Sequence, residues 1–307
     1  MKKTRVLITG GSGLLALNWA CAIRDDMHVT LAMHKHSVKL RGVDFCILDL
    51  SNLSLLNDQI RFLDPDLIIH TAGLTNVDMC EKYPDLAFHV NAEISHNLAL
   101  ISVQNNIQLV HISTDHLFSH SDNLYSEDSI TSPLNEYAKS KLLAEELVAK
   151  VNQNAIIIRT NFFCWGYSQR QSFSDWIIYS LRAGKMLSMF DDVAITPILA
   201  DNLAQSTHEL AALGVSGIFN VVGDDKITKY DFSIRLAMKF NLPIGNIIQD
   251  QLANSNLFAK RPHNMALDNS KVSKILARKV GGLDSFFTDL YSQEINGRVG
   301  EIYNAVS

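Results

Sequence analysis

Short apolar runs alternate with helix-length patterns through the first half of the chain. The runs are Arg5–Thr9, His28–Met33, Val43–Leu48, Asp66–Thr71, Gln108–Ser113 and Ala155–Arg159. The patterns between them are Leu14–Arg24, Asn52–Phe62, Pro84–Gln104 and Leu134–Val151. Continuous apolar strands separated by helices are typical of a parallel sheet that is covered on both faces. The alternation therefore predicts an α/β fold with a doubly wound parallel sheet.

Composition excludes several classes of protein. The 307 residues are 47% hydrophobic and 19% charged, as in ordinary globular proteins, and no stretch approaches the roughly 20 apolar residues of a membrane helix. A net charge of -5 argues against a nucleic-acid partner. The four cysteines are scattered and lack metal-ligand spacing, which suits reduced thiols in the cytoplasm and predicts no metal site.

A glycine turn follows the first predicted strand, in the pattern G-x-x-G-x-x-A formed by Gly10, Gly13 and Ala16. Such a turn allows positive φ and a close backbone approach to a pyrophosphate, which the N–H groups of the next helix then face. A small third residue lets that helix lie close to the sheet. The motif predicts a Rossmann-type fold that binds a dinucleotide, with contacts from Gly10, Ser12, Gly13 and Leu14.

The same 22 residues can also be interpreted as a secretory signal that ends at Ala20-Cys21-Ala22. However, Gly10 to Gly13 interrupt the would-be apolar core, and cleavage after Ala22 would delete the first strand and the phosphate turn. The retained, cytoplasmic form is therefore the expected one.

After about residue 160 the alternation is less regular. This indicates two parts, an NAD(P)-binding domain over 1–160 and a smaller C-terminal substrate-binding lobe over 161–307. The short apolar run Gly217–Val222 lies within the second part, and its return as a strand to the main sheet is left open by the sequence.

The second predicted strand runs into Met33-His34-Lys35-His36 without the carboxylate that usually holds the ribose 2′-hydroxyl of NAD. Groups such as His34 and Lys35 suit a 2′-phosphate, so NADP(H) is the preferred cofactor and NAD(H) the alternative. Asp49 and Leu50 end the third strand, where side chains reach the adenine.

A second group of residues has the side chains needed to reduce a carbonyl. Ser113, Thr114 and Asp115 end a predicted strand, at the edge where open α/β sheets bind ligands, and Tyr137 and Lys141 share one face of a predicted helix. Tyr137 can protonate the alkoxide that develops when a carbonyl is reduced, and Thr114 can bond the substrate oxygen. A nearby ammonium is expected to lower the pKa of the phenol.

These motifs resemble those of the extended short-chain dehydrogenase/reductases, nearest to the dTDP-4-dehydrorhamnose reductase-like group. The resemblance spans nearly the whole chain, through TGGSGLLA, HTAGLTNVDMCE, VNAEIS, ISTDHLF, YAKSK, IIRTNFF, TPILADNLA, GIFNVVG and RPHNMALDNSK. It implies Thr114, Tyr137 and Lys141 as the catalytic trio, with Lys141 also holding the nicotinamide ribose. The remaining implied residues are Ala72, Gly73, Thr75 and Asn91 at the cofactor, and Asp115, His116, Asn161 and Phe162 at the sugar. Arg261 would either border the substrate or brace the lobe.

The resemblance implies an oxidoreductase that reduces a nucleotide-activated 4-keto-6-deoxy sugar with NADPH. Two residues depart from the group's pattern: His116 stands where an aromatic residue is usual, and Ala16 where a third glycine is. The absence of a glutamate after Asp115 argues against a dehydratase, and no cysteine lies near Thr114 in sequence, which argues against an epimerase-reductase. A nucleotide-sugar epimerase and a non-catalytic NADP-binding regulatory subunit remain as alternatives. The fold often pairs through helices, so a homodimer is the assembly to test.

Overall fold

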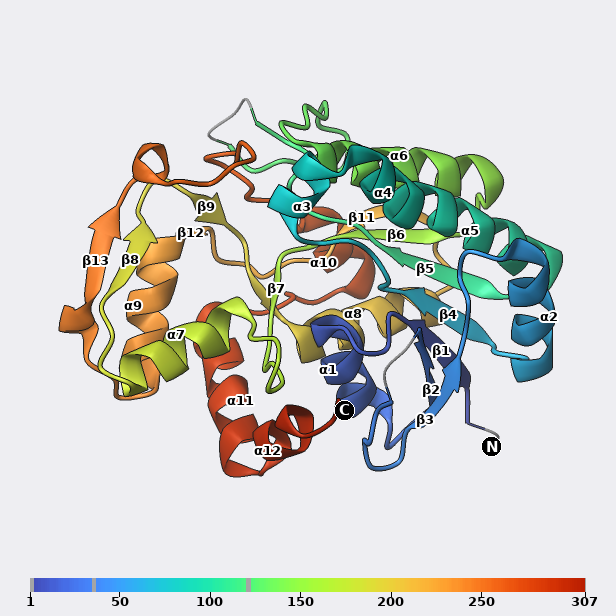
Figure 1. Cartoon of the computed structure of the whole chain (residues 1–307), viewed down its shortest axis with the longest axis horizontal. Helices are drawn as coiled ribbons and strands as arrows, with labels where there is room; N and C mark the ends of the chain where they lie inside the picture. Colours follow the sequence, from blue (N-terminus) through green and yellow to red (C-terminus); the bar gives the residue numbers. More distant parts are fainter. Residues whose placement is uncertain (1–2, 35–36, 120–122, 307) are drawn as a thin grey trace.

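Seven parallel strands form the main sheet of the protein (Figure 1). The structure, a computed structural model, describes residues 3–34, 37–119 and 123–306. In spatial order the strands are β11 (Gly217–Asn220), β6 (Ile156–Arg159), β5 (Gln108–Ile112), β4 (Leu67–His70), β1 (Arg5–Thr9), β2 (His28–Met33) and β3 (Asp44–Ile47). The strand order reverses direction beside β1, as in a doubly wound fold. The predicted fold class is confirmed.

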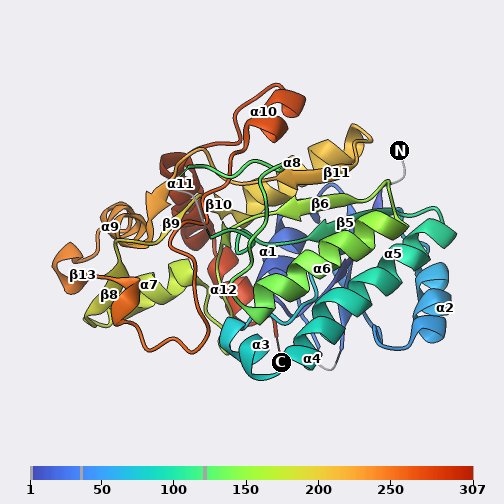
Figure 2. The same cartoon turned by 90° about the horizontal axis from the view of Figure 1, so that it is seen from above.

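Helices cover both faces of the sheet (Figure 2). Alternate strand residues point to opposite sides, so apolar side chains lie on both faces and both need to be covered. In β1, Val6 and Ile8 pack toward one apolar cluster and Leu7 toward another. The first cluster lies under α1 (Leu14–Ile23) and α8 (Ala200–Ala212); the second lies under α2 (Leu53–Leu63), α5 (Ile94–Gln104) and α6 (Glu136–Val151).

The predicted elements of the first half are present, with ends that differ by at most two residues. The predicted helix Pro84–Gln104 is divided into α4 (Pro84–Phe88), a π-helical turn η1 (His89–Glu93) and α5. A short helix, α3 (Val77–Lys82), was not predicted. β11 pairs with β6, so the run whose placement was left open joins the main sheet.

The second part of the chain adds three two-stranded pairings and several helices. The strand pairs are β7 (Phe162–Phe163) with β10 (Ile198–Leu199), β9 (Ala194–Ile195) with β12 (Ile227–Thr228), and β8 (Leu187–Phe190) with β13 (Ile247–Asp250). The helices are α7 (Phe173–Arg182), α9 (Lys229–Lys239), η2 (Ile244–Asn246), η3 (Leu252–Asn254), α10 (Ser270–Leu276), α11 (Leu283–Ile295) and α12 (Arg298–Tyr303). None of the helices in the described ranges has both the length and the apolar character of a membrane span.

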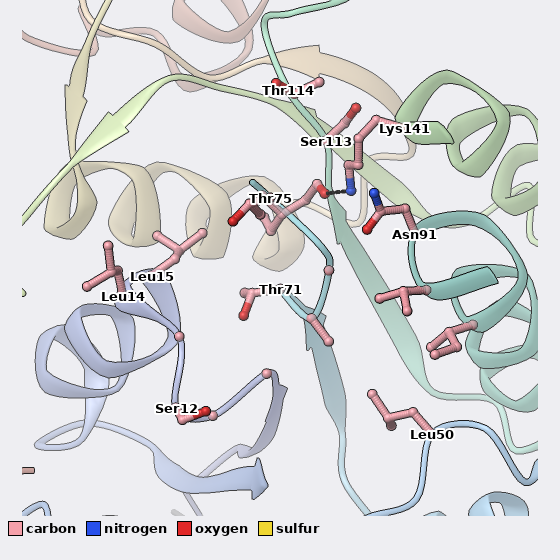
Figure 3. A pocket seen from close by; sticks show the side chains of 18 of the residues that line it. Ser12, Leu14, Leu15, Leu50, Thr71, Thr75, Asn91, Ser113, Thr114 and Lys141 are labelled. Carbon is pink, nitrogen blue, oxygen red and sulfur yellow. Dashed lines mark hydrogen bonds between the residues drawn. The ribbon is translucent and has the colours of Figure 1, made fainter. Parts of the chain in front are cut away.

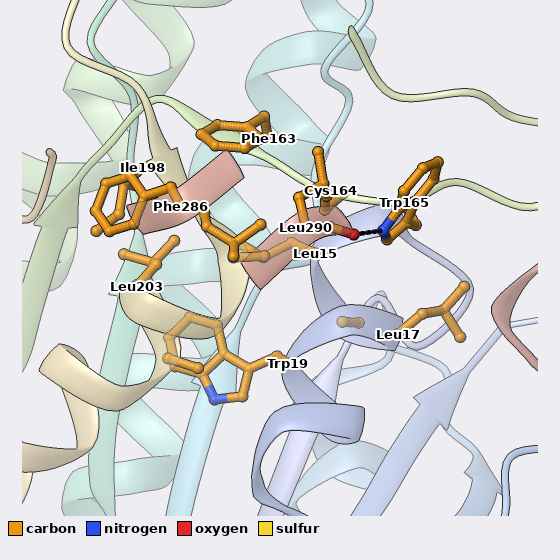
Figure 4. Close-up of a cluster of buried hydrophobic side chains, with 14 of the residues drawn as sticks. Leu15, Leu17, Trp19, Phe163, Cys164, Trp165, Ile198, Leu203, Phe286 and Leu290 are labelled. Atoms are coloured by element: carbon orange, nitrogen blue, oxygen red, sulfur yellow. Dashed lines mark hydrogen bonds between the residues drawn. The ribbon is translucent and has the colours of Figure 1, made fainter. Parts of the chain in front are cut away.

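One hydrophobic cluster joins α1 to the second part of the chain (Figure 4). Trp19 and Trp165 are fully buried in it, and the Trp165 indole Nε1 donates a hydrogen bond of 3.1 Å to the Leu290 carbonyl. Ala16 on the same helix is also fully buried, as expected for the small residue that lets α1 lie close to the sheet. α1 is therefore held between the sheet and the second part, which fixes the direction of its N-terminus.

Candidate active site

A cavity of about 710 Å³ opens at the carboxyl edge of the main sheet. Figure 3 shows Ser12 and Leu14 on one side of it, Asn91 and Lys141 on the other, and Thr71 and Thr75 between. Successive strands contribute the residues at their ends. Of the predicted site residues in the described ranges, those that line the cavity are Gly10, Ser12, Gly13, Leu14, His34, Asp49, Leu50, Ala72, Gly73, Thr75, Asn91, Thr114, Asp115, His116, Tyr137, Lys141, Asn161 and Phe162.

The turn between β1 and α1 has the geometry of an anion cradle. Gly10 has φ +72°, and a Cβ there would lie 2.8 Å from the Ala72 Cα. Gly13 donates its N–H to the Gly10 carbonyl at 2.7 Å. The first turn of α1 carries no side-chain cap and no acidic residue, so its N–H groups stay available to a ligand. These features fit the pyrophosphate of a dinucleotide.

Asp49 and His34 lie together at the far end of the cavity. The Asp49 carboxylate accepts hydrogen bonds from the Ser51 N–H at 3.0 Å and the Ser51 hydroxyl at 2.6 Å. These bonds, with the charge of His34, lower the pKa of Asp49. A carboxylate therefore lines this end, although it comes from the third strand instead of the second. The predicted contact Lys35, with His36, lies outside the described residues.

Asn91 holds the middle wall of the cavity from the π-helical turn. Its Oδ1 accepts the Leu74 N–H at 2.7 Å, and its Nδ2 donates to the Leu74 carbonyl at 3.1 Å and to the Ser140 hydroxyl at 2.9 Å. A Cβ on Gly73 would lie 3.0 Å from the Asn91 Oδ1. Asn91 thus ties the loop after β4 to α6, the helix that carries Tyr137 and Lys141.

Thr114, Tyr137 and Lys141 meet where β5 ends against α6. α6 begins after Asn135, whose side chain caps the Ala138 N–H at 2.9 Å, and this places Tyr137 and Lys141 one turn apart over the cavity. All three catalytic candidates are buried. The Lys141 ammonium donates to the Ile112 carbonyl at 2.6 Å (Figure 3).

The electrostatics of the trio differ from the expectation. Burial raises the pKa of Tyr137, and the opposing effect of the Thr114 hydroxyl on this pKa is smaller. The prediction of a lowered phenol pKa is therefore wrong: desolvation of the phenolate is the largest effect, and the charges of Asp115 and Cys80 add to it. Burial also lowers the pKa of Lys141 to about 8, although the Glu145 carboxylate acts in the other direction.

Asp115, His116 and Asn161 line the cavity next to Tyr137. The Asn161 amide donates to the Asp115 carboxylate, while burial raises the pKa of Asp115 to about 6. The His116 ring stands edge-on to the Tyr137 ring with centroids 5.6 Å apart. Burial lowers the pKa of His116 to about 3, so its ring is neutral near pH 7.

Arg261 does not line the cavity. Its guanidinium contacts the Asp78 carboxylate at 2.9 Å and the Ala259 carbonyl at 2.8 Å. These contacts tie the first turn of α3 to the second part of the chain, as in the bracing alternative.

Several residues of the cavity and its surroundings were not predicted from the sequence. Arg170 lines the cavity and donates to the Thr75 hydroxyl at 2.9 Å, but it lies in a loop with no recognisable motif. His89 and Val90 also line it, from the π-helical turn. Cys80 packs in the same small apolar cluster as Tyr137, where burial raises its thiol pKa to about 11.

Comparison with known proteins extends these observations. The family model described as RmlD substrate binding domain matches residues 4–283. The probable low-salt glycan biosynthesis reductase Agl14 of Haloferax volcanii is 30% identical over 272 residues, with 86% of this chain and 90% of that protein covered. The dTDP-4-dehydrorhamnose reductase of Aggregatibacter actinomycetemcomitans is 28% identical, with 88% and 92% covered. Methionine adenosyltransferase 2 subunit beta of Xenopus laevis is 27% identical, with 88% and 82% covered.

Solved structures show the same fold. A hypothetical dTDP-4-dehydrorhamnose reductase from Sulfolobus tokodaii superposes with a TM-score of 0.80 at 32% identity, covering 92% of this chain and 98% of that one. The dTDP-4-dehydrorhamnose reductase of Bacillus anthracis in complex with NADP has the same fold, with a TM-score of 0.83 at 22% identity and 95% and 100% coverage. The chain belongs to the RmlD substrate-binding-domain family, within the extended short-chain dehydrogenase/reductases.

Proposed function

We propose that this protein reduces the 4-keto group of a nucleotide-activated 4-keto-6-deoxy sugar with NADPH as reductant. One observation carries the proposal: Thr114, Tyr137 and Lys141 line the same cavity as the uncapped, glycine-rich start of α1. The similarity to a dTDP-4-dehydrorhamnose reductase supports the reaction type. The nucleotide and the sugar are the variables that the experiment below must identify.

The residues present fit a nicotinamide dinucleotide. The backbone of Gly10, Ser12 and Gly13 would hold the pyrophosphate, Leu50 would pack on the adenine, and Lys141 would hold the nicotinamide ribose. When bound, the cofactor supplies the hydride that reduces the carbonyl carbon. Ala72, Gly73 and Thr75 would line the nicotinamide half, where glycine at 73 leaves room beside Asn91.

The protein's own residues then transfer one proton to the substrate oxygen. The Thr114 hydroxyl positions the substrate oxygen, and the Tyr137 hydroxyl gives its proton to that oxygen as negative charge develops on it. Because burial raises the pKa of Tyr137, the phenol is protonated at neutral pH and ready to act as an acid. The Lys141 ammonium stabilises the phenolate that remains. Asp115 and Asn161 would bond sugar hydroxyls, and Phe162 would pack on the ring.

The test is an assay with a panel of dTDP-, UDP-, GDP- and CDP-linked 4-keto sugars. Reduction of each sugar is measured as the oxidation of NADPH. We expect turnover with at least one donor and a loss of about 10²- to 10⁴-fold in kcat for Tyr137→Phe, because the general acid is removed. NADPH binding by this variant, measured by fluorescence, serves as the control for folding. Undiminished turnover in Tyr137→Phe would contradict the mechanism.

NADPH is the proposed cofactor because His34 lines the end of the cavity where a 2′-phosphate would lie. We expect kcat/KM to be about tenfold or more higher with NADPH than with NADH, the size of one charge-assisted hydrogen bond. In His34→Asp the preference should shrink, since a carboxylate repels the phosphate. Preference of the native protein for NADH would reverse the assignment and leave Asp49 as the candidate ribose ligand.

A regulatory role is the second candidate, favoured by the similarity to methionine adenosyltransferase 2 subunit beta. It predicts NADPH binding without turnover of any sugar in the panel. The same assay therefore separates the two functions.

A further inference from the structure

The ammonium of Lys141 has a second buried partner besides the Ile112 carbonyl. His111, the residue before Ile112 on β5, lies with its Nε2 3.4 Å from the Lys141 Nζ. His111 is fully buried and Lys141 is 6% exposed. An ammonium has three N–H donors, so two bonds into the protein leave one donor for the cavity that Lys141 also lines.

The hydrogen-bond geometry fixes the tautomer of His111. A lysine ammonium only donates, so Nε2 must be unprotonated and the ring proton must lie on Nδ1. Among the described residues, His111 Nδ1 has no hydrogen-bond partner, although it is buried. A buried, unpaired N–H destabilises a fold. The Nδ1–H group of His111 therefore lowers the stability of the fold, while Nε2 on the other side of the ring accepts a hydrogen bond from Lys141.

Neighbouring groups do not replace this acceptor. His70 is the register partner of His111 on β4, with ring centroids 5.5 Å apart, but its nitrogens contact the Thr9 hydroxyl at 2.7 Å and the Ser95 hydroxyl at 3.0 Å. Glu145, one turn after Lys141 on α6, accepts from Ser113 at 2.5 Å and from Arg159 at 2.7 Å. Tyr137, one turn before Lys141, is a phenol whose pKa burial raises, and its hydroxyl interacts with Thr114.

We propose that His111 is a positioning residue: its neutral ring accepts a hydrogen bond from Lys141 and holds the ammonium, charged, beside Tyr137. The catalytic role of His111 rests on the proposed reduction, but the hydrogen bond between His111 and Lys141 is independent of any substrate. Burial opposes the charge on Lys141, and the Glu145 carboxylate acts in the other direction. A hydrogen bond from the ammonium to the neutral His111 ring also favours the charged form of Lys141. Removal of the acceptor should therefore make Lys141 lose its proton at lower pH.

The experiment follows the titration of Lys141 directly. Lysine side chains are isotope-labelled, the Lys141 signal is identified by its loss in Lys141→Met, and its chemical shift is followed against pH. We expect His111→Leu to lower the pKa of Lys141 by about 0.5 to 1 unit, the equivalent of one neutral hydrogen bond. His111→Gln, whose amide oxygen can reach the Nε2 position, should restore most of the shift.

His70→Gln is the matched control, because it changes a buried histidine beside His111 that does not bond Lys141. It should leave the titration of Lys141 within about 0.2 unit, well below one hydrogen bond. If His111→Leu does not fold, His111→Gln is compared with His111→Asn, whose shorter side chain cannot reach Lys141. Equal titration of Lys141 in the native protein and in either Leu or Asn variant would overturn the proposal.

Turnover provides a separate reading. If the sugar is reduced, the alkaline limb of kcat against pH should move down in His111→Leu by the same amount as the Lys141 titration, with KM for the sugar unchanged. A shifted titration with no reducible sugar would reject the proposed function and keep the role of His111 in holding Lys141. An unshifted titration with normal reduction would reject the role of His111 alone.

Discussion

At the scale of single residues, the turn before α1 depends on glycine for two separable reasons. Gly10 and Gly42 have nearly the same backbone, with φ of +72° and +71°. A Cβ on Gly10 would lie 2.8 Å from backbone atoms of Ala72, whereas a Cβ on Gly42 would meet nothing within 4 Å. Substitution of Gly42 therefore measures the cost of the backbone strain alone. Substitution of Gly10 measures that cost together with the cost of the close approach to Ala72.

We predict that Gly42→Ala lowers the free energy of unfolding by about 1–2 kcal/mol, the cost of a left-handed non-glycine residue. Gly10→Ala should lose more stability, because the loop after β4 must move away. It should also weaken NADPH binding by about tenfold or more, since the proposed pyrophosphate site lies at the same turn. Denaturant unfolding and a fluorescence titration measure the two effects. Equal stability losses in both variants would show that the approach to Ala72 is unimportant.

At the scale of elements, sequence periodicity predicted the strands and helices of the first half and hence the cavity at their ends. Most of the described cofactor and catalytic candidates line that cavity because they directly follow strands or lie on α6, whereas Asn91 reaches it from η1. Arg170 was not predicted because a loop position has no periodic signal. The sequence left two roles open for Arg261, and only its tertiary contact with Asp78 distinguishes between them.

The π-helical turn η1 escaped prediction for a different reason. The apolar pattern of Pro84–Gln104 continues through it, so the sequence indicates one uninterrupted helix. Only the tertiary structure shows that Asn91, within the turn, bonds both backbone groups of Leu74 and the hydroxyl of Ser140. Such insertions often mark functional sites. Likewise, no sequence pattern reveals that desolvation raises the pKa of Tyr137, because burial depends on the whole fold.

At the scale of the whole molecule, buried histidines link stability to pH. His70 and His111 are at most 1% exposed, and burial lowers the pKa of both, to about 3 for His70. In the unfolded chain each titrates near 6.5. Because the folded state binds fewer protons, their contribution to stability is complete above about pH 6.5 and is lost progressively as the pH falls toward 3.

We therefore predict that the free energy of unfolding declines from about pH 6 downward, by up to ~1.4 kcal/mol per pH unit for each histidine that stays neutral in the fold. Urea unfolding between about pH 7 and pH 4.5 measures the slope, above the range where most carboxylates titrate. His70→Gln should reduce the slope by one proton relative to the native protein, whatever its stability at pH 7. An unchanged slope in that variant would mean that His70 takes up its proton without unfolding, and the polar chain from Thr9 to Ser95 would then have to accommodate the charge.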